Sequence, residues 1–76
     1  MNTAKLETPR YLVKVNTTDK EIMVHDKILN DTYQGEYEPS TIHPGKINIK
    51  ARTHVALTQL VRFQGFIEAA DLHQEA

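Results

Sequence analysis

Two short runs, RYLVKVN over residues 10–16 and EIMVHD over residues 21–26, alternate between apolar and polar side chains. A period of two predicts β-strands that bury one face and leave the other in solvent. The polar cluster at residues 16–19 between the runs is typical of a turn. The sequence therefore predicts an antiparallel hairpin. Tyr11, Val13 and Val15 fall on one face of the first strand, and Ile22 and Val24 on one face of the second.

Two further strands are predicted after this hairpin. Tyr33, Gly35 and Tyr37 alternate with polar residues and indicate a third strand, in which the glycine marks a bulge or a close backbone approach. The pair Pro44-Gly45 has the signature of a type II turn. Residues 47–52 alternate cleanly again, and they predict a fourth strand with three polar side chains outward.

The remaining part of the chain has the pattern of an amphipathic helix. Thr53 is a suitable N-cap, and apolar residues then recur at steps of three and four. One helix from Thr53 to Leu72 places these apolar residues in a single stripe along one side, with Gly65 on the polar side. An alternative divides the segment at Gln64-Gly65 into two helices, but the continuous stripe favours one. The stripe consists of Ala56, Leu60, Phe63, Ile67 and Ala70, widened by Val55, Phe66 and Leu57.

Together these elements predict an α+β fold. We expect a small antiparallel sheet of three to four strands, followed by one long amphipathic C-terminal helix packed on it. Residues 1–9 have few apolar side chains and a proline, so a flexible N-terminal arm is expected there. Residues 10–72 are then a single domain, and residues 73–76 a frayed tail.

Composition limits the class of protein. The chain has 76 residues, of which 39% are hydrophobic, and no Cys, which excludes disulfides and Cys-based metal sites. No apolar run approaches the roughly 20 residues of a membrane span, so no membrane partner is expected. The absence of Cys fits a cytoplasmic protein. Because a domain of this size has a thin core, association with a second copy is expected.

Charge is unevenly distributed although the formal net charge is only −1. Residues 39–67 carry four basic residues and no carboxylate, between two acidic segments. Such a layout offers complementary patches to another protein, and tyrosine is enriched at binding hot spots. The candidate partner-binding residues are Tyr33, Tyr37, Lys46, Lys50 and Arg52.

No motif points to catalysis, a cofactor or a metal. The four histidines lack the spacing of a zinc pair. Ser40 and His43 form a local polar cluster rather than a catalytic triad, and the three glycines form neither a P-loop nor a dinucleotide motif. We therefore expect a non-enzymatic regulatory or inhibitory module that binds another protein, as a homodimer.

The segment from Lys46 to Phe66, a strand that leads directly into a helix, resembles the start of a ribbon–helix–helix repressor. In that family, two chains pair their strands into a ribbon whose alternate polar residues contact base edges in the major groove. The resemblance implies a dimeric DNA-binding transcriptional regulator. Its nucleic-acid-binding residues would be Asn48, Lys50 and Arg52, and this is the alternative to protein binding.

Overall fold

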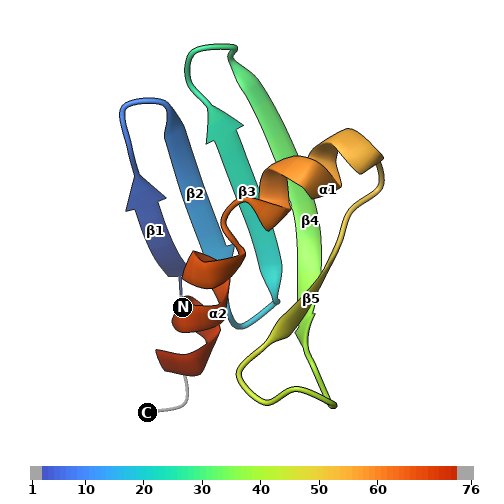
Figure 1. The fold of residues 1–76 in the computed structure, drawn as a ribbon. Helices are drawn as coiled ribbons and strands as arrows, with labels where there is room; N and C mark the ends of the chain where they lie inside the picture. The colour runs from blue at the N-terminus through green and yellow to red at the C-terminus, as the bar shows by residue number, and fades with distance from the viewer. Residues whose placement is uncertain (1–2, 74–76) are drawn as a thin grey trace.

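The computed structural model describes residues 3–73, which form an antiparallel sheet of five strands and two short helices. The strands lie side by side in chain order, and both helices pack on the same face of the sheet (Figure 1). The elements are β1 (Thr3–Glu7), β2 (Tyr11–Asn16), β3 (Glu21–Asp26), β4 (Asp31–Pro39), β5 (Ile47–Lys50), α1 (His54–Val61) and α2 (Gln64–His73).

The predicted hairpin is confirmed as β2 and β3, with Val13 opposite Val24. The turn between them is closed by the Asn16 side chain, whose Oδ1 accepts hydrogen bonds from the backbone N–H groups of Thr18 and Asp19. Lys20 then adopts a φ of +57°, which returns the chain into β3. Short polar side chains that bond to the backbone favour such turns over continued strand.

The prediction of three to four strands is wrong, because β1 was missed in the segment expected to be an irregular arm. Thr3–Glu7 pairs along its whole length with β2, and Ala4 and Leu6 turn toward the core opposite Val15 and Val13. Two modest apolar side chains give a weak local signal, and the strand is formed through its pairing with β2. Residues 1–2 of that arm, and residues 74–76 of the predicted tail, lie outside the described residues.

The third and fourth predicted strands are present as β4 and β5. The turn before β5 also has the predicted form, since Gly45 has a φ of +84° and the Lys46 N–H donates to His43 O over 3.1 Å. Strand β5 ends at Lys50, two residues earlier than the alternation suggested. It is the second edge of the sheet and pairs on one side only, with β4.

The prediction of one long helix is also wrong. Thr53 caps α1 as expected, since its Oγ1 accepts the Ala56 N–H over 3.1 Å, but α1 ends at Val61 and α2 begins at Gln64. The segment is therefore a helical pair, as in the alternative that divided it near Gln64-Gly65. The break keeps both halves over the sheet. No helix among residues 3–73 has the length and apolar character needed to span a membrane.

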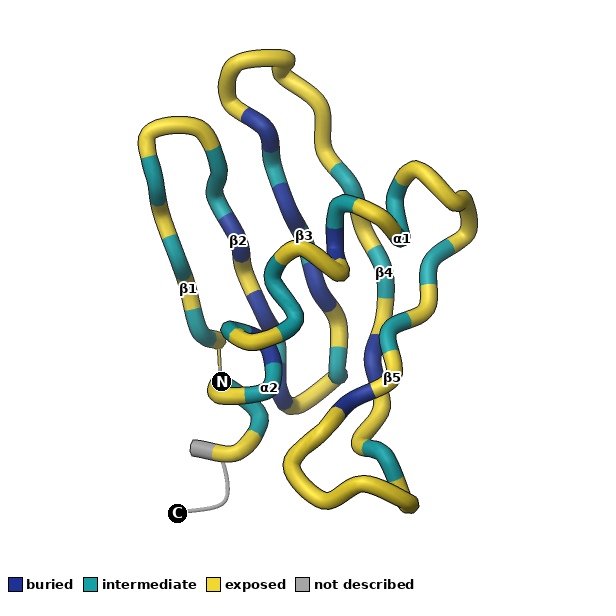
Figure 2. Tube along the Cα trace, in the orientation of Figure 1, coloured by how far each residue is buried: buried dark blue, intermediate teal, exposed yellow. Residues whose placement is uncertain are grey.

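The core lies between the sheet and the helices (Figure 2). Leu60 of α1 and Ile67 of α2 are both fully buried, and Phe63 between the helices packs edge-on against Tyr11, with ring centroids 5.3 Å apart. The predicted close backbone approach at Gly35 is confirmed. A Cβ placed there would overlap Leu60 Cδ1 and the backbone oxygen of Lys50. The buried hydrophobic residues are Val13, Val15, Ile22, Val24, Tyr37, Ile47, Leu60 and Ile67.

Candidate binding surface

The face of the sheet opposite the helices has no layer of the described structure over it (Figure 1). The strand register aligns its side chains in rows that cross the sheet, and two neighbouring rows lie beside a third through Glu7, Leu12, His25 and Thr32. The first row runs through Lys5, Lys14, Met23 and Gln34. The second runs through Thr3, Asn16, Glu21, Glu36 and Lys50. We call this uncovered surface the open face.

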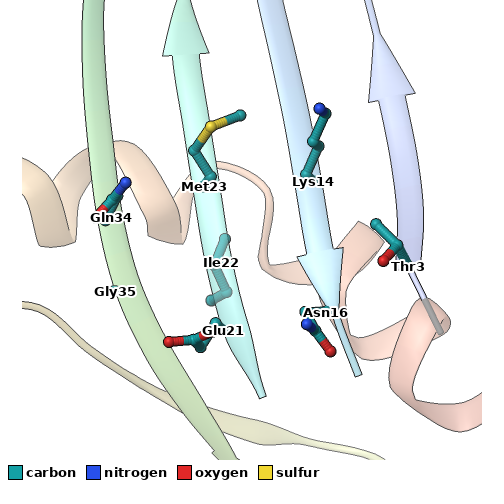
Figure 3. A pocket seen from close by; sticks show the side chains of 8 residues that line it. All are labelled: Thr3, Lys14, Asn16, Glu21, Ile22, Met23, Gln34 and Gly35. Atoms are coloured by element: carbon teal, nitrogen blue, oxygen red, sulfur yellow. The ribbon is translucent and has the colours of Figure 1, made fainter. Parts of the chain in front are cut away.

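A hollow of about 300 Å³ lies on the open face, over β1 to β4. Met23 is half-buried there, between Lys14 on one side and Gln34 on the other. Figure 3 shows these side chains on the side of the sheet away from the helices. The Met23 thioether is polarisable and flexible, so it can adapt to varied apolar contacts. The amide and charged side chains around it can form directed hydrogen bonds. The lining residues are Thr3, Lys14, Asn16, Glu21, Ile22, Met23, Gln34 and Gly35.

The three residues of the DNA-binding alternative lie in or just after β5. Asn48 and Lys50 stand on the open face opposite Glu38 and Glu36, and Lys50 Nζ is 3.2 Å from Glu38 Oε1. Arg52 is exposed and lines a second hollow of about 670 Å³, which Glu36 also lines. Carboxylates therefore flank the basic residues, which weakens attraction to phosphates.

β5 does not match a ribbon–helix–helix strand in its pairing. Its partner is β4 of the same chain, and the two helices that follow pack on that same sheet. On its free edge, the Ile47 N–H donates to Glu68 Oε2 over 3.3 Å. The strand–helix–helix order of that family is present, but the strand is already committed to an intramolecular sheet.

The basic segment at residues 39–67 is partly neutralised by carboxylates from other elements. Lys46 Nζ lies 3.9 Å from Glu68 Oε1, and Lys50 is paired with Glu38. Both lysines remain largely exposed. The expected patch of uniform positive charge is therefore a mixed-charge surface, which suits contact with a protein of similarly mixed charge.

The two candidate tyrosines lie on the covered side of the sheet. Tyr33 is half-buried against the core, and Tyr37 is only 3% exposed. The Tyr37 hydroxyl donates to Asp71 Oδ1 over 2.9 Å, and Lys20 Nζ lies 3.3 Å from the same oxygen. Burial and the nearby Asp71 carboxylate raise the pKa of Tyr37 far above its ordinary value. Because its ring is enclosed, Tyr37 is not part of the candidate binding surface.

A charged cluster supports the β3–β4 hairpin at the far end of the sheet. Asp26 Oδ2 accepts from Arg10 Nε and Nη2, and its Oδ1 accepts the backbone N–H groups of Ile28 and Leu29. Burial alone would raise the pKa of Asp26, but the Arg10 hydrogen bond and the two backbone donors outweigh it and hold the pKa below 3.8. Ile28 and Leu29 project into solvent at the tip, 70% and 57% exposed.

The polar cluster at Ser40 and His43 has a structural role. Ser40 Oγ accepts the backbone N–H groups of Ile42 and His43, which stabilises the loop before β5. His25 Nδ1 is within 2.9 Å of Thr32 Oγ1 on the neighbouring strand. Among residues 3–73, no group of three or more His, Asp or Glu side chains is placed to hold a metal ion.

Sequence reasoning did not select the residues around the hollow, namely Lys14, Met23 and Gln34. The signal was present, because the alternation that turned Val13, Val15 and Val24 inward also placed Lys14 and Met23 on the opposite face. Comparison with family models, with curated proteins and with solved structures gives no match. The function therefore has to be inferred from the chain's own residues.

Proposed function

We propose that this protein is a small non-enzymatic regulatory or inhibitory module that binds another protein through the open face, as a homodimer in the cytoplasm. The observation that carries the proposal is the one-sided architecture. Both helices lie on one face, while the other face presents two ordered rows of polar side chains around the half-buried Met23.

The chemistry of the open face supports contact with a protein rather than with nucleic acid. Lys5 lies opposite Lys14 in one row and Glu21 lies opposite Glu36 in the next, so the face carries a positive pair over β1 and β2 and a negative pair over β3 and β4. A partner with matching charges gains specificity from this pattern. Met23 supplies the adaptable apolar contact at the centre.

The small core supports the homodimer. Within the described residues, eight hydrophobic side chains are buried, whereas Ile42 and several other large apolar side chains stay in solvent. Association of two copies is a common way for domains of this size to gain stability. The absence of Cys from all 76 residues supports the cytoplasmic location.

Site-specific photo-crosslinking in the cells that naturally produce the protein tests the proposal. A photoreactive amino acid replaces Met23 in the hollow or, as the control, Val55, which is 61% exposed on α1. We expect a discrete protein adduct from position 23 and none from position 55. Excess wild-type chain should suppress the adduct, and excess Lys14→Glu chain should not, because Lys14 lines the hollow.

Two outcomes contradict the proposal. One is the absence of an adduct at position 23 from a variant that keeps the wild-type melting temperature. The other is retention on a DNA duplex that falls steeply with salt and is lost in Lys50→Ala, which would favour the DNA-binding alternative.

A further inference from the structure

The two edges of the sheet are protected to different degrees. β5 has only four residues, and the Glu68 side chain accepts a hydrogen bond at its free edge. Lys46 precedes the strand and Lys50 ends it. β1, at the other edge, has five residues in unbroken register with β2 and contains neither a bulge nor a proline. Its two charged side chains, Lys5 and Glu7, have opposite signs and can therefore pair across a two-fold axis, so this edge can act as a template for a second copy of itself.

The outward backbone groups of β1 follow from its register. The Thr8 N–H donates to Tyr11 O over 2.8 Å, so these opposed residues form a hydrogen-bonded pair. Such pairs alternate along an antiparallel ladder, and Leu6 is therefore bonded to Val13. The N–H and C=O groups of Lys5 and Glu7 consequently point away from β2. Within residues 3–73, no strand lies beyond β1 to receive them (Figure 1).

From this edge we infer that two copies of the chain join through their β1 strands, antiparallel, with the two-fold axis beside Leu6. This inference rests on the homodimer part of the proposed function and names its surface. In this register Lys5 stands opposite Glu7 of the second copy, and Glu7 opposite Lys5 of the second copy. Both opposed residues have outward backbone groups, so each pair exchanges two hydrogen bonds.

Charge selects this register over its neighbours. A two-fold axis at Lys5 would place two lysines opposite each other, and an axis at Glu7 would place two glutamates opposite each other, both of which are unfavourable. The Lys5 and Glu7 side chains are 58% and 52% exposed. Within one chain, Lys27 occupies Glu7 Oε2 at 2.7 Å, while Lys5 lies 4.0 Å from Oε1. The ion pair at Oε1 is therefore long, and in the dimer Oε1 would exchange it for the lysine of the second copy.

The dimer would have a continuous ten-stranded sheet. Its helices would all lie on one side, and the two open faces would merge on the other. Thr3 lines the hollow at the β1 edge, so the two hollows would lie on opposite sides of the two-fold axis. A partner with two-fold symmetry, or one with a repeated motif, would then contact both hollows at once.

Charge reversal provides a test with built-in controls. Sedimentation velocity over a wide concentration range should show a dimer for the wild-type chain. Lys5→Glu and Glu7→Lys should each raise the dimer dissociation constant about tenfold or more, because both pairs between position 5 of one copy and position 7 of the other become like-charged. An equimolar mixture of the two variants should form a heterodimer, since the acidic β1 of the Lys5→Glu chain then pairs with the basic β1 of the Glu7→Lys chain. Thermal melts of each variant alone verify its fold.

Hydrogen exchange identifies the interface independently. At high protein concentration the amides of Lys5 and Glu7 should become protected, whereas at low concentration only Ala4 and Leu6 should be, because their N–H groups face β2. A wild-type chain that stays monomeric overturns the inference, as does a dimer in which Lys5 and Glu7 exchange freely. If the adduct at position 23 still forms in either case, the protein-binding function stands and only the β1 dimer fails.

Discussion

The two faces of the sheet are built from the same five strands, yet they have opposite character. On the covered face, Val13, Val15 and Val24 are fully buried and Leu60 of α1 sits directly against Gly35. On the open face, Lys14 and Gln34 remain in solvent around Met23. The proposed function therefore assigns stability to one face and recognition to the other, across one backbone layer. Substitutions on the covered face should therefore affect folding, and those on the open face should affect binding.

The largest expected effect is on the covered face, at Gly35. Gly35→Ala places a methyl group against the Leu60 side chain and the backbone oxygen of Lys50, so the backbone at the end of β5 must shift. We expect a loss of about 3 kcal/mol in the free energy of unfolding, as for other overpacked cores. Urea denaturation measures it.

The matched control is Gly65→Ala, which adds the same methyl group to α2 in open space. It should stabilise the protein by up to about 1 kcal/mol, because alanine is the better helix former. Equal effects of the two substitutions would show that Leu60 and the Lys50 backbone do not pack tightly against Gly35.

The second largest effect concerns Asp26, whose side chain is 3% exposed. Asp26→Asn removes the charge that holds Arg10 and should cost about 2 kcal/mol at neutral pH. The pKa of Asp26 is lowered on folding, so its contribution is present above the ordinary value of 3.8 and is lost as the pH falls through the lower, folded pKa.

Thermal melts between pH 7 and pH 2 test whether the stabilisation by Asp26 is lost on acidification. The difference in melting temperature between wild type and Asp26→Asn should be largest near neutral pH and should shrink below about pH 4. A difference that grows on acidification would contradict the ion pair between Arg10 and Asp26.

A smaller effect is expected at Tyr37, where the two layers meet. Tyr37→Phe removes the hydroxyl that donates to Asp71, while Lys20 keeps that carboxylate paired. We expect a loss of about 1 kcal/mol, seen as a decrease of about 4–8 °C in melting temperature for a domain of this size. An unchanged melting temperature would mean that the bond contributes nothing to stability.

The smallest effects on folding are expected on the open face. Lys14→Glu and Gln34→Ala should each change the free energy of unfolding by less than about 0.5 kcal/mol, because both side chains are exposed. Lys14→Glu should nevertheless abolish competition for the partner. A large loss of stability in either variant would remove the contrast between the two faces.

Local signals in the sequence predicted the local features of the fold. The alternation in β2 and β3, the N-cap at Thr53, the turn at Gly45 and the close approach at Gly35 all depend on a few neighbouring residues. Each of these features follows from side-chain periodicity or backbone freedom, which are readable without knowing what lies nearby in space.

The features that were missed depend on distant parts of the chain. β1 forms through its pairing with β2, and the break after Val61 accompanies the burial of both Leu60 and Ile67 against the sheet. The basic segment loses its uniform charge because β4 and α2 bring Glu38 and Glu68 beside it. The enclosure of Tyr37 likewise needs Asp71, which is 34 residues away.

The simple order of the strands has a consequence for the speed of folding. Each strand of the sheet pairs only with its neighbours in the chain, so most of the ladder forms by closing short loops. Folding rates fall as the mean sequence separation of contacting residues rises. The chain should therefore refold on the order of milliseconds.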